Sequence, residues 1–60
     1  MEDLKKVLDQ VAEVYAALQK DAQAQLVKGN KAAGTRARKA ALELSKLCKE
    51  YRKVSLEAAK

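Results

Sequence analysis

One break interrupts a chain whose apolar residues otherwise keep helical spacing. Before the break they recur at alternating steps of four and three residues, and after it they do so again. The first series is Leu4, Leu8, Val11, Tyr15, Leu18 and Ala22; the second is Ala33, Ala37, Ala40, Leu44, Leu47, Tyr51, Val54 and Ala58. Seven-residue patterns of this kind are typical of amphipathic helices that pair along an apolar seam. With no proline and two glycines in 60 residues, the sequence predicts two long helices.

The ends of the first predicted helix carry the charges that helix termini favour. Glu2 and Asp3 lie in the expected first turn and Lys28 in the last, where each opposes the helix dipole. Gly29 can adopt the left-handed conformation that commonly ends a helix. We therefore expect a helix over about residues 2–28.

Two residues compete to start the second helix. Asn30 would cap a helix that begins at Lys31, whereas Thr35 would leave residues 29–34 as a loop. We favour Asn30, because two alanines follow closely, which predicts a helix over about 31–58 after a turn at 29–30. Gly34 would then lie in the first turn, where its missing side chain would admit another backbone or a phosphate.

Folding the chain at the turn brings the two seams together. The predicted fold is all-α: a single domain over residues 1–60, built as a two-helix antiparallel hairpin. Tyr15 and Tyr51 fall on the seams and Cys48 lies beside one, so we expect all three side chains to be buried in the core.

A hairpin of this size needs additional stabilisation. A 60-residue domain buries only about 60% of its unfolded surface. One cysteine and no histidine exclude an internal disulfide and a zinc site, which leaves self-association. We predict a homodimer that forms a four-helix bundle. Val7, Val14, Leu42 and Leu56 lie off the main seams and offer a surface for it, although Leu42 and Leu56 could equally face water.

Several classes of function are disfavoured by composition. Without histidine the commonest general base is missing, and 60 residues cannot enclose an ordinary ligand cavity, so we expect no enzyme, no cofactor and no small-molecule substrate. No apolar run approaches the ~20 residues of a membrane span. The acidic opening at Glu2 and Asp3 does not resemble a signal peptide, and a lone cysteine suits a reducing compartment.

Positive charge is concentrated after the break. Residues 1–28 hold four cations and five acids, whereas residues 29–60 hold nine cations and three acids. The densest segment, 28–39, contains no acid and carries Lys28, Lys31, Arg36, Arg38 and Lys39. Arginine forks, glycines and a helix N-terminus together favour a phosphate backbone as the partner.

The second helix continues the positive charge along its predicted outer face. Lys46, Lys49, Arg52 and Lys53 share that face with Arg38 and Lys39, and could follow the backbone of a duplex. The face also has a regular register in which Lys39, Lys46, Lys53 and Lys60 alternate with Glu43, Glu50 and Glu57. Glutamate–lysine pairs at this spacing stabilise helices, so a merely solvated face is the competing interpretation.

Three short motifs resemble a known family. They are the run Lys28-Gly29-Asn30-Lys31-Ala32-Ala33, then Arg36-Ala37-Arg38, and then Tyr51-Arg52-Lys53 followed by Ser55. These residues resemble the core of the bacterial histone-like proteins typified by the chlamydial developmental histone, which is named for its likeness to linker histones. The resemblance is good over about residues 28–60, and the first helix matches only as an amphipathic helix.

The resemblance implies a nucleoid-associated protein of the bacterial cytoplasm that binds and condenses double-stranded DNA with little sequence preference. Carried over by position, it assigns DNA contacts to Lys28, Lys31, Arg36, Arg38, Arg52 and Lys53. The chlamydial protein continues into a Lys/Ala-rich tail, which this sequence lacks, so we expect lower affinity per monomer and a greater role for dimerisation.

Other functions remain open at this point. A coiled-coil module that binds proteins and no nucleic acid would explain the heptads equally well, but not the acid-free segment 28–39. A helix lying on anionic membranes, or binding to RNA instead of DNA, would use the same cations.

Overall fold

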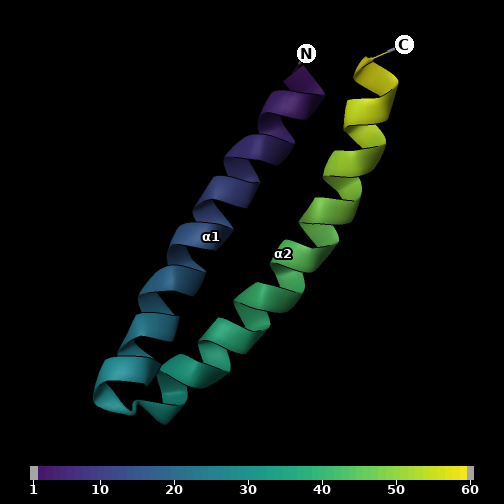
Figure 1. Ribbon diagram of the computed structural model, residues 1–60. Coiled ribbons are helices and arrows are strands. Elements are labelled where there is room, and N and C mark those ends of the chain that lie inside the picture. The colour runs from purple at the N-terminus through teal and green to yellow at the C-terminus, as the bar shows by residue number, and fades with distance from the viewer. Residues whose placement is uncertain (1, 60) are drawn as a thin grey trace.

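Two helices packed side by side make up the described chain. The computed structural model describes residues 2–59, with α1 spanning Glu2–Lys28 and α2 spanning Lys31–Ala58. They run antiparallel, and their free ends lie together at the end away from the turn (Figure 1). The molecule is a rod of 46 × 14 × 11 Å. Residues 2–59 contain no strand, which confirms the all-α prediction. Over the same residues, neither helix has the long apolar stretch that crossing a membrane requires.

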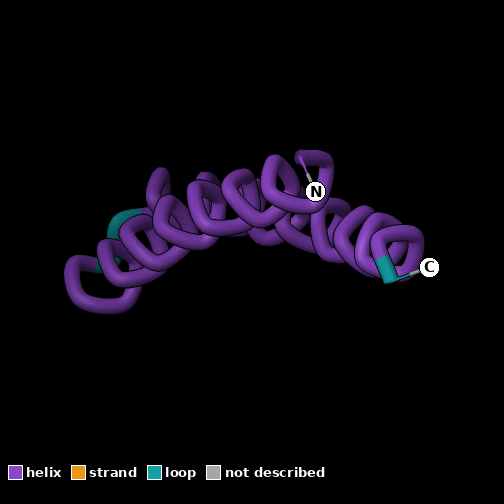
Figure 2. The backbone as a smooth tube through the Cα atoms, turned by 90° about the horizontal axis from the view of Figure 1, so that it is seen from above, coloured by secondary structure: helices purple, strands orange, loops and turns teal. Residues whose placement is uncertain are grey.

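Gly29 and Asn30 alone connect α1 to α2 (Figure 2), and each of them caps one of the two helix ends. Gly29 has φ +64°, and its N–H donates to the Gln25 carbonyl at 2.9 Å, as in a left-handed C-cap. Asn30 then caps α2: its side-chain oxygen accepts from the Ala33 N–H at 3.1 Å. Asn30, and not Thr35, therefore starts the second helix.

The seam of α1 differs from the predicted one. Val7 is buried at 4% exposure and Val14 is half-buried, whereas Leu8 and Tyr15 are 47% and 50% exposed and Ala22 is also exposed. Leu4, Val11 and Leu18 belong to both candidate stripes and are half-buried. The prediction that placed Leu8, Tyr15 and Ala22 on the seam was wrong, because the apolar face of α1 is wider than one partner helix can cover.

The seam of α2 is the predicted one. Ala33 and Ala37 are buried beside the turn, and the residues beyond it are half-buried: Ala40, Leu44, Leu47, Val54 and Ala58. Tyr51 is 37% exposed, so the prediction that its side chain is buried in the core was wrong. Small residues let the helices approach closely near the turn. Gly34 is buried there, and a Cβ added to it would lie 2.7 Å from Cδ of Gln25. The Gln25 side chain of α1 thus fills the space beside Gly34, which was expected to admit another backbone or a phosphate.

Much of the apolar surface is left uncovered within the single hairpin. The buried apolar side chains of the described chain are Val7, Ala33 and Ala37. Cys48 is exposed, contrary to the prediction, because it lies on the flank of the α2 seam that α1 does not reach. Leu42 and Leu56 are also exposed, at 60% and 65%. The predicted dimer surface is corrected as well, since Val7 and Val14 already pack inside the hairpin.

Candidate nucleic-acid interface

All the cations singled out by the sequence are exposed. They are Lys28, Lys31, Arg36, Arg38, Lys39, Lys46, Lys49, Arg52 and Lys53. The first five lie between the end of α1 and the third turn of α2, and the others lie further along α2. By contrast, α1 mixes Lys5, Lys6 and Lys20 with five acids. The concentrated positive surface therefore consists of the turn and α2.

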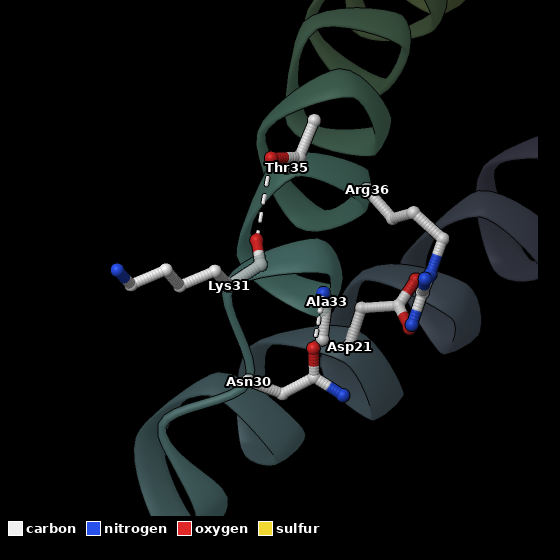
Figure 3. A network of polar contacts seen from close by, with 6 residues as sticks. All are labelled: Asp21, Asn30, Lys31, Ala33, Thr35 and Arg36. Atoms are coloured by element: carbon white, nitrogen blue, oxygen red, sulfur yellow. Dashed lines mark hydrogen bonds and ion pairs between the residues drawn. The ribbon is translucent and has the colours of Figure 1, made fainter.

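Hydrogen bonds at the start of α2 position the side chain of one of these cations, Arg38. Lys31 extends its side chain away from both helices (Figure 3). The Thr35 hydroxyl donates to the Lys31 carbonyl at 3.3 Å and accepts from Nη2 of Arg38 at 3.3 Å. Thr35 thus holds the guanidinium of Arg38 against the helix surface. Thr35 was predicted only as a possible cap, although its spacing of three residues from Arg38 is a signal for this contact.

Arg36 turns toward the other helix. Its Nε donates to Oδ1 of Asp21 at 3.3 Å, and Figure 3 shows the guanidinium reaching across to that carboxylate. The Asp21 side chain is 18% exposed and that of Arg36 is 58% exposed. A pair this open to water contributes about 0–1 kcal/mol to stability. Asp21 was missed because the predicted seam placed Ala22, not Asp21, toward α2.

The other cations make no ion pair. Within residues 2–59 the pair between Arg36 and Asp21 is the one salt bridge, so the expected glutamate–lysine pairs along α2 are not formed. Long side chains in water lose rotamer freedom when they pair, which offsets most of the Coulomb gain. Lys39, Lys46 and Lys53 therefore remain available to an external anion. Lys60, the last lysine of that register, lies outside the described residues.

The outer face of α2 has the dimensions of a nucleic-acid backbone contact. Lys39, Lys46 and Lys53 recur every seven residues along one side of the helix and span about 21 Å at 1.5 Å per residue. Lys49 lies beside them, whereas Arg52 lies about 100° further round the helix. Double-stranded DNA carries one phosphate per about 3.4 Å of helix axis on each strand, so three lysines over this length can each contact a phosphate.

Comparison with known proteins supports the same assignment. The family model for histone H1-like protein Hc1 matches residues 1–60, so the similarity includes α1 and is not limited to residues 28–60 as expected. No curated protein and no solved structure matches the chain. A histone H1-like family suggests a DNA-binding nucleoid protein. With an all-helical fold, a cationic second helix and a match over its whole length, the chain belongs to the family of histone H1-like protein Hc1.

Proposed function

We propose that this protein binds double-stranded DNA without sequence preference and compacts it within the bacterial nucleoid, in the cytoplasm. The turn cations and the outer face of α2 contact phosphates. Each contact releases condensed counterions from the duplex, which supplies the binding free energy. Phosphate contacts carry no sequence information, and α2 has neither Asn nor Gln to read adenine.

The observation that carries this proposal is the unpaired state of the cations. Lys28, Lys31 and Arg38 near the turn, and the lysines of the α2 outer face, are exposed and make no ion pair in the described chain. A face whose lysines were neutralised by neighbouring glutamates would favour the alternative of a solvated coiled-coil module. The histone H1-like family adds independent support for DNA as the partner.

Arg36 has a weaker role in this proposal than the other cations. Its charge is partly compensated by Asp21, and its side chain links the two helices. Reversing its charge would disturb the hairpin as well as any DNA contact. A test of binding should therefore leave Arg36 unchanged.

Association between chains would raise the affinity of such a small surface. A homodimer carries the positive face twice, and the second contact forms at the high effective concentration set by the first. We propose that the protein acts as a homodimer, which allows one assembly to contact two segments of DNA.

Neutralising the α2 lysines should weaken binding in a measurable way. The triple variant Lys39→Gln, Lys46→Gln, Lys53→Gln removes three charges from one row. If each lysine contacts one phosphate, the slope of log K against log salt falls in magnitude by about 2.7. Fluorescence anisotropy with a random-sequence duplex at several salt concentrations measures it.

The matched control removes the same charge from the other helix. Lys5→Gln, Lys6→Gln, Lys20→Gln leaves the turn and α2 intact, so it should retain nearly the whole salt slope. Equal losses in both variants would mean that net charge matters and the α2 face does not. Circular dichroism checks that both variants remain helical. Failure of the unaltered protein to bind DNA at low salt would reject the proposed function.

A further inference from the structure

One row of residues on a flank of the hairpin carries no charge. Relative to each seam, the flanking row consists of Leu8, Tyr15 and Ala22 on α1 and of Ala41, Cys48 and Ser55 on α2, and we call these six residues the uncharged row. Five of them are exposed and Ser55 is half-buried. The opposite flank is polar, with Asp3 and Gln10 lying beside Glu50 around one shallow pocket. Because that pocket joins the polar flanks of both helices, the uncharged row occupies the other side.

The two halves of this row differ in size. On α1 the row contains the bulky Leu8 and Tyr15 together with Ala22 near the turn, whereas on α2 it contains only the small Ala41, Cys48 and Ser55. The contacts of Asp21 with Arg36 and of Gln25 with Gly34 set the level of each helix against the other. By that register Tyr15 lies level with the space between Ala41 and Cys48.

The hairpin exposes more surface area than a compact monomer of the same mass. The chain of 6.6 kDa exposes 4905 Å². A compact monomer of that mass exposes about 3,900 Å², so the hairpin exposes about 1,000 Å² more. A stable interface of standard size buries about 800 Å² on each partner. The excess is thus close to what one partner of a dimer must bury.

We propose that a second copy of this chain packs on the uncharged row, related by a two-fold axis parallel to the hairpin. This deepens the homodimer of the proposed function by assigning its surface. The axis places α1 of one copy over α2 of the other, so that Leu8 and Tyr15 enter the spaces left by Ala41, Cys48 and Ser55 of the second copy. Under this symmetry the bulky half of each row faces the small half of the other copy's row. The surface is therefore complementary to itself without ion pairs between the two copies.

The arrangement also directs the DNA contacts. The lysine rows of α2 lie away from the uncharged row and away from α1, so the two copies present them on opposite sides of the bundle. Two faces that point apart can hold two separate duplexes. The dimer therefore bridges DNA segments, in place of clamping one duplex between its subunits.

Charge placed on the uncharged row should separate the subunits. Tyr15→Glu should change the mass by light scattering from that of a dimer to that of a monomer. The matched control, Leu42→Glu, adds the same charge at an exposed apolar residue outside the row, and it should remain dimeric while binding DNA more weakly. A Tyr15→Glu protein that stays dimeric, or a Leu42→Glu protein that dissociates, would overturn the proposed surface.

The single cysteine provides a second test on the unaltered protein. Cys48 is open in the hairpin and covered in the proposed dimer, so its reaction with a thiol reagent such as dithionitrobenzoate should slow several-fold as protein concentration rises through the dimerisation range. A rate that does not change across that range contradicts the proposal, even if Tyr15→Glu fails to fold. Flotation of a monomeric protein with anionic vesicles would assign the row to lipid instead.

The outcomes separate the two proposals. DNA bridging is measured by capture of free duplex on immobilised duplex. If Tyr15→Glu loses bridging but still binds DNA, the result supports both the proposed function and the proposed dimer surface. A wild-type dimer that ignores DNA rejects the proposed function and leaves the surface assignment standing.

Discussion

Gly29 holds a backbone conformation that other residues rarely adopt. Its φ of +64° ends α1, and nothing lies within 4 Å of the position that a Cβ would take. The cost of a side chain there is therefore backbone strain alone, about 1–2 kcal/mol for alanine. Gly29→Ala should lower the free energy of unfolding by about that amount, measured by urea denaturation at fixed protein concentration. Gly29→Asn should lose less, since asparagine tolerates left-handed geometry, and equal losses would contradict this explanation.

Some residues could be placed from the sequence and others could not. The roles of Gly29 and Asn30 depend on chemistry within four residues of chain, so local rules were sufficient. The contact of Arg36 with Asp21 depends on how α1 is rotated about its axis, which no local rule fixes. Exposure of Cys48 depends on how far α1 extends over the flank of the α2 seam, which no local rule fixes either. The cations themselves were identified correctly as exposed, because lysine and arginine are almost never buried unpaired.

At the scale of the helix, the start of α2 depends on one side chain. Asn30 satisfies the Ala33 N–H, whereas Thr35 bonds a carbonyl inside the helix. Asn30→Ala should therefore destabilise the protein by about 1 kcal/mol. Thr35→Ala, the control, should change stability by less than about 0.5 kcal/mol, as expected for an exposed position. Thermal unfolding followed by circular dichroism distinguishes them; a larger effect at Thr35 would indicate that the helix begins later.

The rotation of α1 shows what a heptad pattern leaves undetermined. Two stripes, one through Val7 and Val14 and one through Leu8 and Tyr15, share the residues Leu4, Val11 and Leu18. Hydrophobicity favoured the second stripe, but α2 covers the first. An apolar face this wide is typical of a helix with neighbours on two sides, as in a bundle. The width of the apolar face of α1 could be predicted from the sequence. Which of its two stripes packs against α2 could not.

For the whole molecule, stability should depend on concentration. With Val7, Ala33 and Ala37 as its buried apolar residues, the described hairpin has a small core, and the proposed dimer would enlarge it. The melting temperature of the unaltered protein should rise when its concentration is increased 100-fold, by circular dichroism. Tyr15→Glu should show little change over that range. A concentration-independent melting temperature for the unaltered protein would mean that the hairpin is stable without a partner.

The free ends of α1 and α2 lie together, far from the cationic turn (Figure 1). A biotin or fluorophore joined near either end is therefore about a rod's length of 46 Å from the turn. Immobilisation through either end should expose Lys28 and Lys31 equally to solution. A donor–acceptor dye pair, one on each helix end, would report directly when the two arms separate.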